Sequence, residues 1–109
     1  MDLTKVEALF NELFDFNNLV RNATKYIENI LLESDTNFLS EEVTDEFCAF
    51  NKLRIEYNMT YLLINKLTSM PSFRLKFHLI ESNAEILKYV YEIEYNCSGE
   101  FLDEYFLDY

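Results

Sequence analysis

The scarcity of glycine and proline is the feature of this sequence that most restricts its fold. Among 109 residues there is one glycine, Gly99, and one proline, Pro71. The many tight turns of a β-sandwich or barrel depend on the backbone properties of these two residues. We therefore expect an all-α fold, in which a few long helices are joined by few corners.

The hydrophobic content of the chain indicates a folded single domain spanning residues 1–109. Half of the residues are hydrophobic, whereas disordered chains combine low hydrophobicity with high charge. A length of 109 residues is typical of one domain and leaves no room for a second. The formal net charge of −11 argues against direct binding to nucleic acid, which requires a basic surface.

The first predicted helix covers residues 4–33. It begins with a capping box, Thr4 to Glu7, in which the two side chains accept hydrogen bonds from the first free amides. Apolar residues then recur every three or four positions, which predicts one buried stripe. The stripe consists of Val6, Leu9, Leu13, Phe16, Val20, Ala23, Ile27 and Ile30.

The second predicted helix covers residues 40–69 and ends before Pro71. Ser40 is a favourable N-cap, and Glu41 and Glu42 follow it where the helix dipole favours negative charge. Apolar residues occupy more than half of its circumference, which is typical of a central helix or of an oligomer interface. An assembly module that dimerises through this helix is therefore one alternative function. Its seam would contain Phe50, Tyr57, Met59 and Tyr61.

The third segment, residues 72–97, is ambiguous at its start. Residues 73–79 alternate between apolar and polar as a half-buried strand would, yet apolar residues also recur at helical spacing. We expect a helix, because a single strand would have no partner, and residues 82–85 form a second capping box. Gly99 would end this helix. Residues 100–109 form an acidic and aromatic tail, either a short fourth helix or a free segment. The expected architecture is an elongated antiparallel three-helix bundle with this tail.

Charge is strongly segregated along the chain. Residues 28–46 carry seven acids and no base, residues 81–109 carry eight acids and one base, and residues 47–80 carry five bases and one acid. In an up-down-up bundle the first connection and the tail would lie at the same end. That end would form an acidic pole of twelve carboxylates: Glu33, Asp35, Glu41, Glu42, Asp45, Glu46, Glu92, Glu94, Glu100, Asp103, Glu104 and Asp108.

An acidic pole of this kind predicts a binding function. A field of one sign steers association with a basic surface, and most basic surfaces in cells bind nucleic acid. We expect an inhibitor of a nucleic-acid-handling enzyme that partly mimics nucleic acid, such as a phage anti-defence or anti-CRISPR protein. An immunity protein or antitoxin for a basic toxin would use the same physics. An acidic surface without a charge-specific partner is the simplest alternative. The predicted contacts are Glu41, Glu42, Asp45, Glu46, Asp103, Glu104 and Asp108, with Phe101 and Tyr105 as aromatic anchors.

The sequence carries no recognisable catalytic, metal or cofactor motif, so we expect neither an enzyme nor a cofactor. His78 is the only histidine, and Gly99 alone cannot build a glycine-rich phosphate loop. Cys48 and Cys97 are expected to be free thiols in a reducing compartment. No apolar run approaches the roughly 20 residues of a membrane span, and no signal peptide is visible. These observations predict a cytoplasmic protein, in a bacterial host cell if it is phage-encoded.

Overall fold

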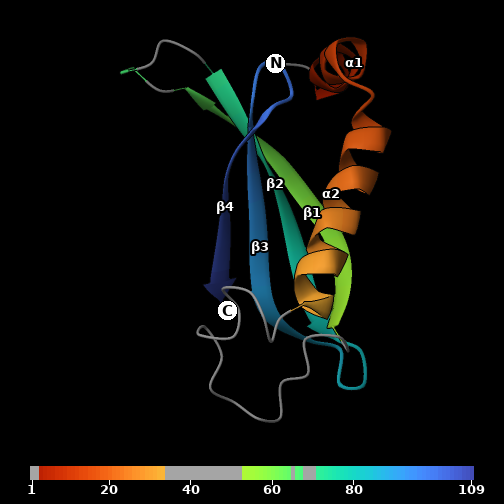
Figure 1. The fold of residues 1–109 in the computed structure, drawn as a ribbon. Coiled ribbons are helices and arrows are strands. Elements are labelled where there is room, and N and C mark those ends of the chain that lie inside the picture. Colours follow the sequence, from red (N-terminus) through yellow and green to blue (C-terminus); the bar gives the residue numbers. More distant parts are fainter. Residues whose placement is uncertain (1–2, 34–52, 65, 68–70) are drawn as a thin grey trace.

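The computed structural model is a four-stranded antiparallel sheet with two helices on one of its faces, so the prediction of an all-α bundle is wrong (Figure 1). It describes residues 3–33, 53–64, 66–67 and 71–109. Each strand pairs antiparallel with the next along the chain, which gives the order β1-β2-β3-β4. The elements are α1 (Leu3–Leu13), α2 (Phe16–Leu32), β1 (Leu53–Ile64), β2 (Pro71–Glu81), β3 (Ile86–Asn96) and β4 (Phe101–Asp108).

The predicted helix over residues 4–33 exists but is divided into α1 and α2. Asp15 lies between the two helices in extended conformation and caps α2, since its side chain accepts a hydrogen bond from the amide of Asn18 at 3.3 Å. Phe14 lies at the same corner and packs its ring 5.2 Å from that of Phe73 on β2. The capping aspartate therefore starts a new helix, and the two helices can follow different directions over the sheet (Figure 1).

The predicted third helix is in fact the hairpin of β2 and β3, so the strand alternative for residues 73–79 is the correct one. Alternate residues of β2 from Phe73 to Leu79 are fully buried under the helices. Residues four apart on a strand also share a face, so the pair Phe73 and Phe77 satisfies both periodicities. The strand over these residues does not lack a partner, because β2 pairs with β1 on one side and with β3 on the other.

Part of the predicted second helix is strand β1. This strand is rich in β-branched and aromatic residues, which fit a pleated and half-buried surface. Its pairing with β2 is shifted by a bulge at Asn58. Residues 40–52 of that predicted helix, including Phe50 and the acidic residues Glu41, Glu42, Asp45 and Glu46, lie outside the described residues.

The tail is neither a helix nor a free segment but strand β4, which pairs with β3. The turn before it is built on Asn96, whose side-chain oxygen accepts hydrogen bonds from the amides of Ser98 (2.9 Å) and Glu100 (3.0 Å). Gly99 has a φ of +81°, and a Cβ atom there would lie 3.3 Å from the ring of Phe14. Gly99 therefore serves a turn rather than a helix end.

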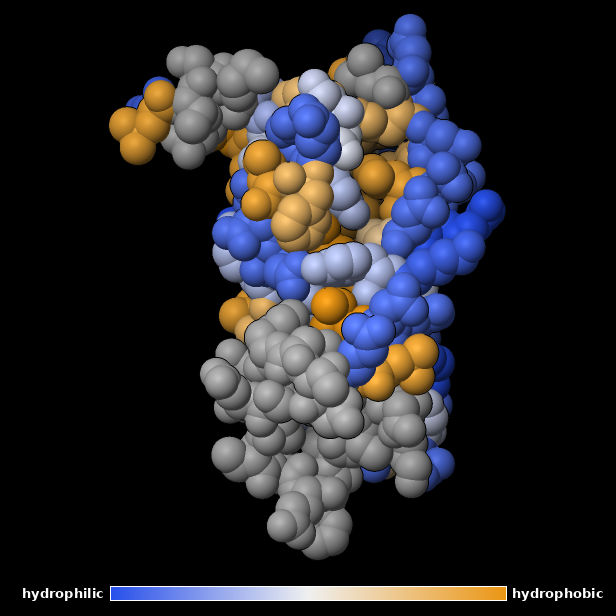
Figure 2. All heavy atoms as spheres, viewed as in Figure 1, coloured by the Kyte–Doolittle hydropathy of each residue, from blue (hydrophilic) through white to orange (hydrophobic). Residues whose placement is uncertain are grey.

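The core lies between the helices and the sheet. Alternate residues of β2 and β3 face α2, which buries one narrow stripe against them. The exterior of α2 is hydrophilic, as the blue ridge along one side of Figure 2 shows. No helix in the described residues is long and apolar enough to cross a membrane. The buried residues that form this core cluster are Ala23, Ile27, Leu31, Phe73, Leu75, Phe77, Leu79, Tyr89, Tyr91, Ile93 and Tyr95.

Candidate protein interface

Strand β4 is the outer strand on one side of the sheet and exposes apolar and acidic side chains together. Phe101 is 50% exposed and Tyr109 is 82% exposed, although large aromatic side chains usually lie inside a protein. Asp103 and Asp108 are exposed on the same strand. We call this set the β4 surface; it consists of Phe101, Leu102, Asp103, Leu107, Asp108 and Tyr109.

Two of the predicted contact residues are held within the fold. Glu104 pairs across from the buried Ile93 and therefore faces the helices. Its carboxylate accepts hydrogen bonds from the hydroxyls of Tyr91, at 2.8 Å, and of Tyr26 on α2. Burial, followed by this bond to Glu104, raises the pKa of Tyr26 to about 12. Glu104 therefore connects α2 to β4.

Tyr105 lies on the opposite face of β4, which the helices do not cover. The guanidinium of Arg74 lies 4.0 Å from the centre of its ring, a cation–π contact. Its hydroxyl also donates a hydrogen bond to Glu94 at 3.4 Å. Burial raises the pKa of Tyr105, and the charge of Glu94 adds to this effect. Tyr105 is thus committed to a cluster of polar side chains on the sheet.

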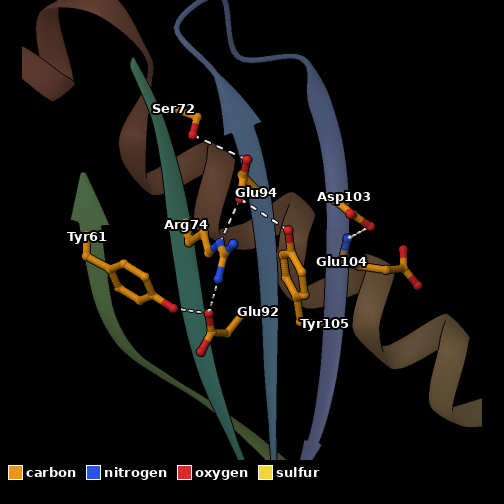
Figure 3. Close-up of polar contacts among 8 residues, drawn as sticks. All are labelled: Tyr61, Ser72, Arg74, Glu92, Glu94, Asp103, Glu104 and Tyr105. Atoms are coloured by element: carbon orange, nitrogen blue, oxygen red, sulfur yellow. Dashed lines mark hydrogen bonds and ion pairs between the residues drawn. The ribbon is translucent and has the colours of Figure 1, made fainter. Parts of the chain in front are cut away.

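This cluster surrounds Arg74 and neutralises two acidic residues of β3 (Figure 3). Arg74 forms ion pairs with Glu94 at 2.7 Å and with Glu92 at 3.4 Å, and Tyr61 donates a hydrogen bond to Glu92. The side chain of Glu92 is only 9% exposed, and burial raises the pKa of its carboxyl group. We call this set the Arg74 cluster; it consists of Tyr61, Ser72, Arg74, Glu92, Glu94 and Tyr105.

The acidic pole of the predicted bundle does not exist among the described residues. Glu100 and Asp108 lie at opposite ends of β4, and Glu92 and Glu94 are paired with Arg74. Charge is instead divided across the described sheet, because β1 and β2 carry three bases and two acids, whereas β3 and β4 carry one base and five acids. The bases are Arg54, Arg74, Lys76 and Lys88, and the acids are Glu56, Glu81, Glu92, Glu94, Asp103, Glu104 and Asp108.

The predicted contact residues thus have different positions. Phe101, Asp103 and Asp108 are exposed on β4, Glu104 and Tyr105 make internal contacts on opposite faces, and residues 41–46 are not described. Leu102 and Leu107 were not among the predicted contacts, because only pairing with β3 makes the tail an edge strand. The recurrence of Phe and Tyr in the tail is the feature of the sequence that favours a strand there.

Other reactive side chains form no site in the part of the chain that is described. Cys97 is exposed as a free thiol, and its sulfur donates a hydrogen bond to the carbonyl oxygen of Pro71 at 2.8 Å. No group of three or more His, Cys, Asp or Glu side chains in the described residues could hold a metal ion.

Comparisons of the chain with protein-family models, with curated proteins and with solved structures find no match.

Proposed function

We propose that this protein binds a basic partner protein through the β4 surface. The observation that carries the proposal is the exposure of aromatic, aliphatic and acidic side chains along one edge strand, on both of its faces. Aromatic anchors surrounded by charge are typical of protein interfaces, in which the anchors contribute most of the affinity. Asp103 and Asp108 form no ion pair within the described residues, so their charge is available to a partner.

The position of β4 at the edge of the sheet supports the same proposal. The outer side of an edge strand presents backbone groups that can pair with a strand of another protein. Two copies of this strand would bring their own aspartates together, which disfavours self-pairing through β4. A partner with lysine or arginine beside an exposed strand would instead be attracted.

Proteins that handle nucleic acid are the class of partner that best fits this charge. Their binding surfaces are basic, and an acidic protein of net charge −11 is attracted to them over several ångströms. Occupation of such a surface would exclude nucleic acid, so the proposed activity is inhibition of a nucleic-acid-handling enzyme in the bacterial cytoplasm, as for a phage-encoded anti-defence protein. A basic toxin as partner would make the chain an immunity protein or antitoxin.

Partner capture with charge-reversed variants tests the proposal. The test variant is Asp103→Lys/Asp108→Lys, and the control is Glu12→Lys/Glu28→Lys, which makes the same charge change at exposed positions on α1 and α2. Captured proteins from a bacterial lysate would be identified by mass spectrometry at low and high salt. We expect the wild type and the control to retain a nucleic-acid-binding protein that the test variant loses and that added DNA displaces.

Two results would contradict the proposal, and a third would distinguish between its two classes of partner. Equal capture of that protein by the test variant would show that the β4 surface is not the contact. Capture unaffected by salt would remove the electrostatic argument. Retention of a basic protein that DNA does not displace would favour the immunity-protein alternative over inhibition of a nucleic-acid-handling enzyme. Circular dichroism of each variant verifies that the sheet is intact.

A further inference from the structure

A groove of about 560 Å³ lies between the two helices and β1, which is at the opposite edge of the described sheet from β4. Its walls come from α1, from the first turn of α2 and from β1. The ring of Phe16 lies 6.0 Å from those of both Phe10 and Tyr57, so an aromatic surface lines the groove. The residues that line the groove include Glu7, Phe10, Phe16, Tyr57, Met59 and Leu62.

The groove borders β1, which is an edge strand of the described sheet. Residues 57–60 line it at the bulge, where Tyr57 pairs with Phe77 and Met59 pairs with Lys76. A ligand in this groove would therefore lie alongside β1, where the outer backbone groups of an edge strand are open to pairing.

The charge of the groove is set by a single residue. Among the described residues that line the groove, Glu7 is the only charged one; it is exposed and takes part in no ion pair with another described residue. The groove therefore favours an apolar ligand that also carries one positive charge next to Glu7.

The same chain presents such a segment at the end of β1. Ile64 is 80% exposed, and Lys66 in the following turn is also exposed. This end of the hairpin projects from the body of the molecule (Figure 1) and shows hydrophobic atoms at its tip (Figure 2). Lys66 takes part in no ion pair within the described residues. An aliphatic side chain and a lysine thus lie together on a strand end that extends into solvent.

We propose that the occupant of the groove is the end of β1 from a second copy of this chain. Ile64 of each copy packs against Phe16 and Met59 of the other, and Lys66 pairs with Glu7. Antiparallel pairing of two β1 strands brings the end of each strand to the groove of the other, so one two-fold contact fills both grooves. Each copy then covers apolar surface that a monomer leaves in water.

A second copy fits better than an unrelated partner because both halves of the contact are present on one chain with opposite charge. The contact lies on the edge opposite β4, so a dimer leaves both β4 surfaces accessible. The net charge of −11 on each copy opposes association at long range. Added salt screens this repulsion, so the dimer should persist at high salt, whereas capture through the β4 surface should weaken.

The test is a charge exchange measured by light scattering and analytical ultracentrifugation. We expect the wild type to reach twice the mass of one chain at high micromolar concentration. Lys66→Glu and Glu7→Lys alone should each raise the dimer dissociation constant roughly tenfold or more. The double variant should have a dimer dissociation constant within about threefold of that of the wild type. Lys25→Glu makes the same charge change as Lys66→Glu at an exposed position of α2, away from the groove, and should leave the dimer dissociation constant unchanged.

A second variant tests the apolar half of the contact. Ile64→Asp should give a monomer with an unchanged circular dichroism spectrum, because a side chain that is 80% exposed contributes little to the core. A wild type that stays monomeric at high micromolar concentration would overturn the proposal. So would a dimer that survives both single reversals, a double variant that remains monomeric, or assemblies larger than two copies, which would show a contact that does not close on itself.

Discussion

Arg74→Ala is the substitution whose effect follows most directly from the structure. Its guanidinium pairs with Glu94 at 2.7 Å and with Glu92 at 3.4 Å, and it lies 4.0 Å from the ring centre of Tyr105. The Arg74 side chain is 26% exposed, while those of Glu92 and Glu94 are 9% and 16% exposed. Its removal therefore leaves two poorly hydrated carboxylates side by side on one strand.

The expected loss of stability is about 3 kcal/mol at pH 7. Breaking a buried ion pair by removing one partner costs about 3–5 kcal/mol, and the partial exposure of Arg74 reduces this to about 2 kcal/mol. Loss of the cation–π contact adds about 1 kcal/mol. In a domain of this size the total corresponds to a decrease in Tm of roughly 10–20 °C.

The loss of stability caused by Arg74→Ala should also depend on pH. Burial raises the pKa of Glu92 in the folded state, so protonation favours the fold and this contribution to stability is lost as pH rises through the folded pKa. Without Arg74 no ion pair offsets this burial, and the pKa of Glu92 rises further. The difference in the free energy of unfolding between wild type and variant should therefore shrink as pH falls from about 7 to about 5.

Urea unfolding at both pH values measures this difference. Arg54→Ala serves as the control, because Arg54 forms comparable ion pairs with Glu56 at 3.2 Å and Glu85 at 2.7 Å that lie in solvent and should matter little. Equal destabilisation by the two substitutions would refute the burial argument. A deficit for Arg74→Ala that is the same at both pH values would refute the role of Glu92.

Three further predictions concern the junctions between helices and sheet. Gly99→Ala should lower the free energy of unfolding by about 1–2 kcal/mol in a urea titration, because φ is +81° and the ring of Phe14 is 3.3 Å from the new methyl group. Glu104→Gln should lower the pKa of Tyr26 from about 12 towards 10 in an absorbance titration, because the carboxylate that disfavours the phenolate is gone. Tyr26→Phe should destabilise the protein by about 1 kcal/mol on urea unfolding, since Glu104 keeps only the bond from Tyr91.

The helical part of the fold was the more predictable part because its signals are local. The stripe that contains Ala23 and Ile27 has helical spacing, and both residues are buried on α2 as expected. The sheet was missed because its turns do not use glycine and proline alone. Asn96 builds the turn before β4 with its side chain, and residues 82–85 connect β2 and β3 without either residue type. Scarce glycine and proline therefore do not exclude a meander of long strands.

The predicted site could be only partly assigned, because a strand sends neighbouring residues to opposite faces. Asp103, Glu104 and Tyr105 are consecutive, yet Glu104 contacts α2 and Tyr105 contacts Arg74. A helical tail would instead have grouped residues three or four positions apart. The register of β4 against β3 decides which side chains of β4 are exposed to a partner. This register depends on contacts between distant parts of the chain, which a local sequence pattern does not reveal.

Binding of the wild type and of Asp103→Lys/Asp108→Lys to a purified captured partner tests the proposed function most directly. The dissociation constant would be measured by calorimetry from about 0.05 M to about 0.3 M salt. We predict that the wild type loses affinity roughly tenfold over this range, that the variant binds at least roughly tenfold more weakly at low salt, and that Glu12→Lys/Glu28→Lys resembles the wild type. Equal affinity of all three proteins, independent of salt, would contradict binding through the β4 surface.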